Sequence, residues 1–329
     1  MRDLDVICLG EALIDFVALQ SGVSLIEAQD FHKAAGGAPA NVAVGLARLG
    51  ARPAFIGKVG DEPFGQVLKK TLDDNGVDTT GMVLDPNART GLAFVSLTET
   101  GERDFVFFRN PSADMTFRPD ELAEELIPRA HILHYGSISL IDEPARTTTL
   151  RAIELAREAG ALLSYDPNLR LNLWPSLERA CEGLREGLAH ADVLKVSEEE
   201  LYLLTGIDDR EQAAWELLDQ GIQLVAVTMG AEGCDCFIPH AQVRIHGHHV
   251  EAVDTTGAGD GFVAGMLAGI LPAWRQGRRP GDLECEELDP ICTYANAVGA
   301  LTTTVRGAIP ALPTADQVEA FLVENPMGV

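Results

Sequence analysis

Runs with the composition of buried β-strands alternate with runs of helical spacing from about residue 120 onward. Alternation of this kind is typical of βαβ units, in which parallel strands form one sheet and helices pack on its faces. Ligands of such sheets bind beyond the carboxyl ends of the strands. The pattern therefore predicts an α/β fold whose ligand edge contains Asp166, Lys195 and Thr228. The expected strands span 132–134, 162–165, 193–196 and 224–228, and the expected helices span 144–159, 177–189, 212–220 and a stretch that begins near Ser197.

Two stretches interrupt this alternation. The first reads as a hairpin whose strands, 92–97 and 103–108, are joined through 99–102. The second, 16–33, contains short apolar pieces around a small turn. Together the two stretches predict a small sheet outside the main layer. An edge hairpin that does not move is the alternative interpretation.

Composition and charge exclude several classes of function. A chain of 329 residues with 46% hydrophobic content can bury a full core. No run of 18 apolar residues occurs, and the N-terminus enters an apolar strand directly, so we expect a cytoplasmic protein without a membrane partner. The six cysteines lack the spacing of a zinc site and are expected to be reduced thiols. The formal net charge of −25 argues against a nucleic-acid partner.

The segment 254–260, Asp-Thr-Thr-Gly-Ala-Gly-Asp, directly precedes an apolar run with helical spacing. The first amides of a helix lack partners inside the helix, and small side chains let a phosphate approach them closely. The residues that would present these amides are Gly257, Ala258 and Gly259. The charge of Asp260 opposes an anion, but a carboxylate is suited to take the proton of an attacking hydroxyl. The alternative is an ordinary tight turn before a helix that Asp254 and Thr255 cap.

The segments 254–260 and 35–50 resemble the two signatures of the pfkB family of ribokinase-like sugar kinases. Further strings resemble its fructokinase branch, so the resemblance covers essentially the whole chain. These strings lie at 10–15, 107–114, 134–137, 166–170 and 195–200. The resemblance implies one domain over 1–329, a ribokinase-like three-layer α/β/α sandwich with a mostly parallel central sheet. It also implies a small β-sheet lid, formed by segments of about 16–34 and 90–110, which covers the sugar and can mediate a homodimer.

The resemblance assigns roles on the sugar side of the site. It makes Asp260 the catalytic base and lets the amides of the 257–259 turn neutralise the transferring phosphoryl group. Arg170 matches an arginine that approaches this group, and a structural ion pair is its alternative role. Asn41 matches a sugar-binding amide but could instead cap the helix that begins near it. The other sugar-pocket positions are Asp15 at the end of the first strand, Gly36, Gly37, Phe107 and the lid residue Arg109, whose alternative is an exposed arginine.

The resemblance also indicates a nucleotide site and two cation sites. The nucleotide positions are Lys195, Thr228, Gly230, Gly233, Ala258, Gly259 and, on a helix beside the adenine, Asn296. The wider family often has Asn-x-x-Glu for ordering Mg²⁺ and its waters. Here Ser197 replaces the asparagine and could cap a helix, while Glu200 keeps an outer-sphere role. Asp254 and Thr256 match positions that hold a monovalent cation, with K⁺ as the candidate. His246, His248 and His249 are expected on an exposed strand or loop.

The expected function is that of an ATP-dependent sugar kinase, most like fructokinase, which converts D-fructose and ATP into D-fructose 6-phosphate and ADP. Its small-molecule partners are then the sugar and ATP, with Mg²⁺ as cofactor. The alternatives within the family are a ribokinase and a 2-keto-3-deoxygluconate kinase, whose substrate carboxylate Arg109 could bind. A non-catalytic sugar sensor is the alternative from another class, although the presence of Asp260 argues against it. A dehydrogenase is not expected, because Gly36-Gly37 does not follow a strand as Gly-x-Gly-x-x-Gly.

Overall fold

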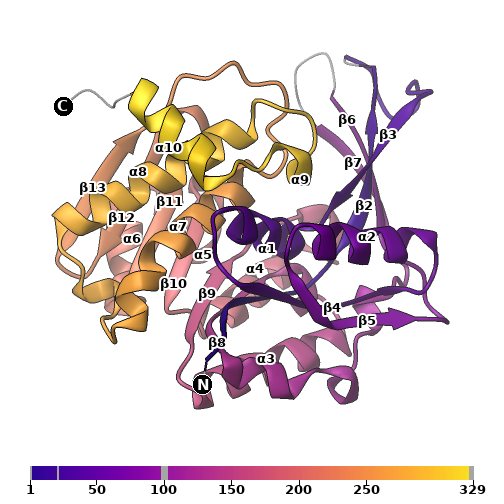
Figure 1. Cartoon of the computed structure of the whole chain (residues 1–329), viewed down its shortest axis with the longest axis horizontal. Helices are drawn as coiled ribbons and strands as arrows, with labels where there is room; N and C mark the ends of the chain where they lie inside the picture. Colours follow the sequence, from indigo (N-terminus) through magenta and orange to yellow (C-terminus); the bar gives the residue numbers. More distant parts are fainter. Residues whose placement is uncertain (1, 21, 98–102, 326–329) are drawn as a thin grey trace.

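The computed structural model describes residues 2–20, 22–97 and 103–325, which form two sheets and the helices around them (Figure 1). Within these ranges the main sheet has nine strands in the order β13-β12-β11-β10-β9-β8-β1-β4-β5. All neighbours from β11 to β5 pair in parallel, and β12 and β13 add an antiparallel edge. The strands are β1 (Leu4–Leu9), β4 (Pro53–Gly60), β5 (Asp78–Asp85), β8 (Ala130–Gly136), β9 (Leu162–Asp166), β10 (Val193–Ser197), β11 (Leu224–Thr228), β12 (Gly233–Ile238) and β13 (Ala241–His246).

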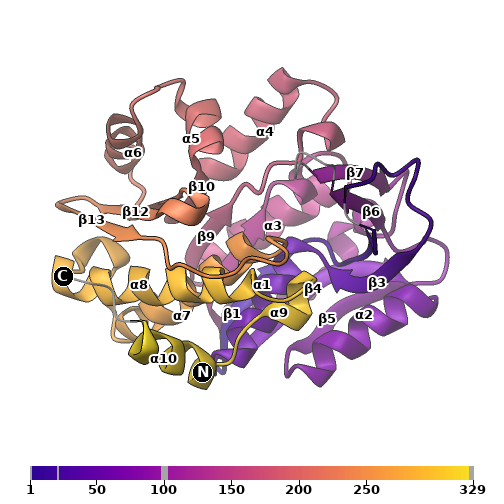
Figure 2. The ribbon, with the colours of Figure 1, turned by 90° about the horizontal axis from the view of Figure 1, so that it is seen from above.

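Helices cover both faces of the main sheet, as the view from above shows (Figure 2). One apolar cluster joins the sheet to α1, α7 and α8, and a second joins its other face to α3, α4, α5 and α6. Parallel strands buried on two faces read as nearly continuous apolar runs, which is why the alternation was visible in the sequence. The helices are α1 (Ala38–Arg48), α2 (Pro63–Asp74), α3 (Ala145–Glu158), α4 (Leu177–Leu188), α5 (Glu198–Thr205), α6 (Arg210–Asp219), α7 (Ala258–Arg275), α8 (Cys285–Thr302), α9 (Ala308–Ala311) and α10 (Ala315–Glu324).

The three-layer α/β prediction is confirmed, and so are α3 and α4 to within one residue at each end. Helix α6 begins two residues before the predicted 212–220, because Asp209 caps it by accepting a hydrogen bond from the Gln212 amide. Lys195 was expected at a strand end but is the third of the five residues of β10. Among the helices of the described ranges, none combines the length and the apolar character that a membrane crossing needs.

The small sheet has the order β3-β2-β6-β7 and stands apart from the main sheet at the upper right of Figure 1. Its strands are β2 (Leu13–Ala18), β3 (Phe31–Gly36), β6 (Leu92–Leu97) and β7 (Arg103–Phe108). The predicted hairpin is confirmed as the antiparallel pair β6 and β7, and its predicted link at 99–102 lies outside the described residues. On one face of this sheet Phe94 contacts the rings of Phe16, Phe31 and Phe108.

One prediction about this region needs correction, and a second stands. Asp15 does not end the first strand, because β1 stops at Leu9 and Asp15 lies within β2 of the small sheet. Gly36 is the last residue of β3, so the glycine pair does lie at a strand end, but its sequence is not Gly-x-Gly-x-x-Gly and that part of the argument against a dehydrogenase stands. The strand also pairs antiparallel with β2, whereas a dinucleotide-binding turn follows a parallel strand of a βαβ unit.

Candidate active site

Helix α7 begins at Ala258, and its N-cap is Gly257 in a left-handed conformation with φ 81°. A Cβ atom at this position would lie 2.6 Å from the Cβ of Ala308, so the turn requires glycine. Asp254 and Thr255 do not cap this helix, because its cap carries no side-chain hydrogen bond. The Ala258 amide makes one long bond of 3.3 Å to the Thr255 carbonyl. The first turn of α7 therefore offers weakly held N–H donors to an anion.

Asp260 is the third residue of α7 and is 7% exposed. Burial is the largest influence on this carboxyl and raises its pKa to about 6, and the charge of Asp166 acts in the same direction. The hydrogen bond from Asn41 opposes the rise, as do the charges of Lys195 and Arg170. A carboxyl with a pKa near the working pH is ionised in a neutral cell and can still accept a proton during a reaction.

Asn41 connects α1 to this carboxylate. Its Nδ2 donates to Oδ2 of Asp260 over 2.7 Å, although the two residues are 219 positions apart. The backbone amide of Asn41 donates to the Gly37 carbonyl, so Asn41 lies inside α1 and does not cap it, contrary to the alternative interpretation. Its Oδ1 is buried and has no hydrogen-bond partner among the described residues. A buried amide oxygen without a partner is costly, so it suits a ligand hydroxyl.

The glycine pair and Asp15 lie together at the start of α1. A Cβ at Gly36 would lie 2.2 Å from Oδ2 of Asp15, so this carboxylate packs directly against the glycine backbone. Gly37 has φ 103°, and a Cβ there would lie 2.5 Å from the Glu11 carbonyl oxygen. Only glycine fits both positions, and its absence of a side chain leaves the turn open beside Asp15. The structure thus brings Asp15, the glycine pair and Asn41 to the same end of α1.

Arg109 is buried and paired with an acidic neighbour. Its Nε donates to Oδ2 of Asp114 over 3.0 Å, its Nη2 forms an ion pair with the same oxygen, and the arginine is 9% exposed. The alternative of an exposed lid arginine is therefore wrong, and a contact of Arg109 with the sugar stays a prediction. Phe107 stacks on Phe105 with ring centroids 5.9 Å apart. The Phe105 ring in turn lies 6.0 Å from the Arg170 guanidinium, so Phe105 connects the lid to the segment that follows β9.

Lys195 and Arg170 are the basic residues near the first turn of α7. Nζ of Lys195 is 3.1 Å from Oδ2 of Asp166, and both side chains are buried. A Cβ at Gly259 would lie 3.0 Å from this Nζ, so the ammonium is adjacent to the first turn of α7. Arg170 donates to the Leu169 carbonyl over 3.0 Å. Among the residues with described positions it makes no ion pair, so the alternative of a structural ion pair is not supported.

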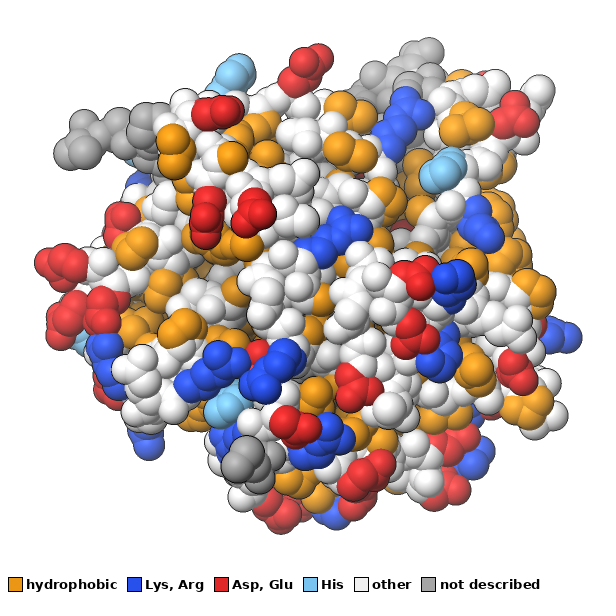
Figure 3. Space-filling model, viewed as in Figure 1, with side chains coloured by type: hydrophobic (Ala, Val, Ile, Leu, Met, Phe, Trp, Pro, Cys, Tyr) orange, Lys and Arg blue, Asp and Glu red, His pale blue; other side chains and the backbone are white. Residues whose placement is uncertain are grey.

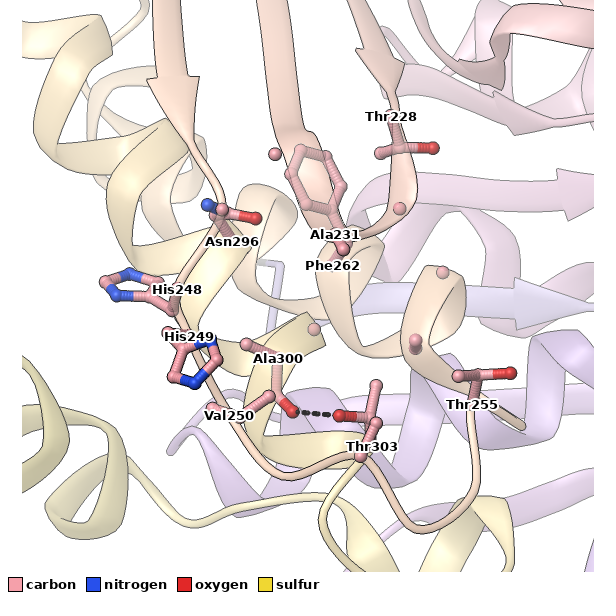
Figure 4. Close-up of a pocket in the computed structure, with 17 residues that line it drawn as sticks. Thr228, Ala231, His248, His249, Val250, Thr255, Phe262, Asn296, Ala300 and Thr303 are labelled. Carbon is pink, nitrogen blue, oxygen red and sulfur yellow. Dashed lines mark hydrogen bonds between the residues drawn. The ribbon is translucent and has the colours of Figure 1, made fainter.

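A cavity of about 360 Å³ opens at the first turn of α7 (Figure 4). This volume lies within the range typical of small-molecule sites. Six of the seven predicted nucleotide positions line the cavity, and Lys195 is the exception. The six are Thr228, Gly230, Gly233, Ala258, Gly259 and Asn296. The Asn296 amide donates to the His246 carbonyl over 2.8 Å, which ties α8 to the end of β13.

The pfkB family carbohydrate kinase model matches residues 3–315. The chain belongs to this family. Fructokinase-1 of Zea mays is 52% identical over 315 residues, which cover 95% of this chain and 96% of that protein. A double-mutant fructokinase of Vibrio cholerae O395, solved with fructose, ADP and potassium, superposes with a TM-score of 0.85 at 38% identity and 97% and 98% coverage. A putative ribokinase II of E. coli, solved with ATP and Mg²⁺, gives a TM-score of 0.86 at 27% identity and 98% and 100% coverage.

Family membership confirms the resemblance and the ribokinase-like fold, but the cation positions of this pfkB member remain predictions. Ser197 is the N-cap of α5, as its alternative role proposed. Both oxygens of Glu200 accept backbone N–H groups, Oε2 from Ser197 over 2.8 Å and Oε1 from Leu169 over 2.7 Å. Asp254 accepts hydrogen bonds from Thr256 and from the Gly307 amide. The described ranges contain no group of three or more His, Cys, Asp or Glu side chains with metal-site geometry.

The sequence did not reveal one wall of the cavity, the connection from β13 to α7. His246 at the end of β13 and His249 in the following loop are exposed, as expected, but His248 and His249 also line the cavity, which was not expected. His248 is half-buried, and its ring lies 5.0 Å from that of Phe321 on α10. Their place in the chain could have indicated this position. They lie shortly before the segment 254–260, and the connection that carries them must end at the predicted anion-binding turn. The other cavity-lining residues that were not predicted come from this connection and from neighbouring elements. They are Ala231, Gly247, Val250, Ala252, Thr255, Phe262, Gly299, Ala300 and Thr303.

Proposed function

We propose that this carbohydrate kinase is a fructokinase, which transfers the γ-phosphoryl group of ATP to the terminal hydroxyl of D-fructose. One observation carries the proposal. The buried carboxylate of Asp260 lies in the helix turn that borders the cavity, and it accepts a hydrogen bond from Asn41, whose buried Oδ1 has no partner among the described residues. The relatives named fructokinase support fructose as the sugar, since the similarity extends over nearly the whole of both chains.

The geometry supports a direct transfer. ATP occupies the cavity with its phosphates at the first turn of α7, and the sugar lies between Asn41 and Asp15. The hydroxyl oxygen forms the new bond to the γ-phosphorus while the bond to the bridging oxygen of ADP breaks, and the hydroxyl proton passes to Asp260. The amides of the turn, together with Arg170, offset the negative charge of the moving group.

Two cations would assist this transfer. Mg²⁺ keeps several water ligands and binds chiefly to substrate phosphates, so it needs few protein ligands. Glu200 fits an outer-sphere role, since its oxygens are held by amides and retain lone pairs for metal-bound water. We place K⁺ at the loop of Asp254 and Thr256. Both cations would neutralise phosphate charge.

The surroundings of Arg109 favour a neutral sugar. A 2-keto-3-deoxygluconate kinase would need a basic group for the substrate carboxylate, but Asp114 already holds the Arg109 guanidinium. Release of ADP should therefore be measured with fructose, ribose, 2-keto-3-deoxygluconate and adenosine. We expect the highest kcat/KM with fructose. A higher value with ribose would make the chain a ribokinase, and turnover of none of the four would favour a sugar sensor.

The pKa of Asp260 predicts how activity depends on pH. The base must be ionised to accept a proton, so kcat/KM for fructose is expected to fall as the pH drops through about 6. Rates at saturating Mg-ATP between pH 5 and pH 8 would measure this fall, which is the acidic limb of the pH profile. Thermal melts over the same range serve as the control, since they separate titration from unfolding. A profile that stays flat through pH 5 would contradict the assignment of the base.

The lid is the surface proposed for a homodimer. The edge strand β7 exposes 59% of Phe108 and 44% of Val106, although Phe108 also packs on Phe94. On the face of the molecule drawn in Figure 3, acidic and basic side chains are interspersed, and hydrophobic side chains are exposed at the right edge beside the lid and α2.

The dimer predicts a difference between two substitutions of exposed apolar residues. Phe108→Lys should convert the protein to a monomer in sedimentation equilibrium, because a charge would then lie in the apolar contact. Val323→Lys is the matched control, since Val323 is 81% exposed on α10, which lies apart from the lid (Figure 1). Wild-type protein that sediments as a monomer would contradict the proposal.

A further inference from the structure

Lys195 and Asp166 form a buried ion pair on neighbouring parallel strands. The pairing of Leu194 with Tyr165 places Lys195 beside Asp166, at the point where β9 ends. The Nζ to Oδ2 distance is 3.1 Å, and the two residues are 7% and 4% exposed. The next strand carries Ala226 at the paired position. Apolar residues of similar volume usually serve stability equally well at such buried positions.

The ammonium group remains charged despite its burial. Burial disfavours the ammonium, but the charges of Asp166 and Glu200 outweigh burial and hold the pKa of Lys195 above its ordinary value. Lys195 does not line the cavity. Its Nζ lies instead beside Gly259, in the same helix turn as Asp260. The charge of Lys195 can therefore influence Asp260 from outside the cavity.

The charges that face Asp260 come from three segments. Asp166 ends β9, Lys195 lies on β10, and Arg170 follows β9, while the neutral Asn41 faces the carboxylate from α1. Without Lys195, two carboxylates would share this pocket with Arg170 as the single facing cation in the described structure. Like charges that share a site cannot both ionise easily. The arrangement therefore needs a cation to keep the base available.

We propose that Lys195 and Asp166 are positioning residues for the phosphoryl transfer: Lys195 favours the ionised form of Asp260, and Asp166 holds Lys195 in place while limiting that effect. The proposal rests on the role of Asp260 as the base. It gives the two partners of one ion pair opposite influences on the same carboxylate, which a purely structural pair would not have.

The test compares the acidic limb of kcat/KM for fructose, at saturating Mg-ATP, in three variants. Lys195→Gln removes a stabilising cation and should move the limb to higher pH by roughly half to one unit. Asp166→Asn removes a like charge and should move the limb to lower pH by a similar amount, roughly half to one unit. The double variant should return the limb to near its wild-type position. Titration of the nucleotide itself is common to all variants and cancels in the comparison.

Lys58→Gln is the matched control, because Lys58 is an equally buried lysine that pairs with Asp85 and Glu121 away from α7. It should lower the melting temperature without moving the limb. If Lys195→Gln does not fold, Asp166→Asn alone decides, since Glu200 still faces the lysine in that variant. Single variants whose limbs stay in place or move in the same direction would overturn the proposal. A near-normal rate in Asp260→Asn would instead refute the proposed base.

Discussion

Asp260→Asn is expected to lower kcat by roughly 10²- to 10⁴-fold while leaving the affinity for Mg-ATP nearly unchanged. An amide keeps the shape of the carboxylate and can still accept the hydrogen bond from Asn41, but it cannot take the hydroxyl proton. Initial rates with fructose and calorimetric titration with Mg-ATP would measure the two effects separately. The matched control is Asp316→Asn, because Asp316 also lies in the first turn of a helix, α10, but is exposed.

Stability should change in the opposite direction from activity. The folded-state pKa of Asp260 is about 6, above its ordinary value of 3.8, so the stability that its protonated form provides is lost as the pH rises through about 6. The neutral amide avoids this loss, and Asp260→Asn should melt at the same temperature as wild type or higher at pH 8. A near-normal rate would remove Asp260 from its role, and a lower melting temperature would indicate a structural defect.

Gly257→Ala should reduce kcat/KM roughly a hundredfold, because a displaced turn loses hydrogen-bond donors to the transferring group. The added Cβ would lie 2.6 Å from the Cβ of Ala308, and φ 81° is a conformation that alanine rarely adopts. The variant should also lose more than about 1 kcal/mol of folding free energy, since steric overlap adds to backbone strain. Steady-state kinetics and urea unfolding would measure these two effects.

Gly277→Ala provides the control for backbone strain. Gly277 follows the other end of α7 with the same φ of 81°, but an added Cβ there would meet nothing within 4 Å. It should cost only about 1 kcal/mol of stability and leave the kinetic constants unchanged. If the two variants had equal kinetic constants, the turn at Gly257 would not take part in the transfer.

The parts of the site that depend on local sequence could be predicted. The cavity residue Thr228 follows from the rule that ligands bind beyond strand ends, and the α7 turn follows from its glycines. Gly230 and Gly233 were predicted from the family resemblance alone. The two-faced burial of the main sheet likewise appeared as apolar runs.

Long-range partners could not be predicted from local pattern. The sequence around Arg109 does not indicate whether its side chain is exposed or paired with Asp114. Burial of the pair depends on how the lid packs on the rest of the chain. The bond between Asn41 and Asp260 joins positions 219 residues apart, and periodicity carries no information over such a separation. The contact of Phe105 with Arg170 also depends on this tertiary arrangement.

The bond between Asn41 and Asp260 has a consequence for biosynthesis. Asn41 is synthesised early. Asp260 follows 219 residues later, when about four-fifths of the 329 residues have been made. A nascent chain that stops before α7 contains the lid strands and all nine strands of the main sheet but lacks Asp260 and the turn around it. On the proposed role of Asp260 as the base, catalytic competence arises late in translation, and prematurely terminated products would not turn over ATP.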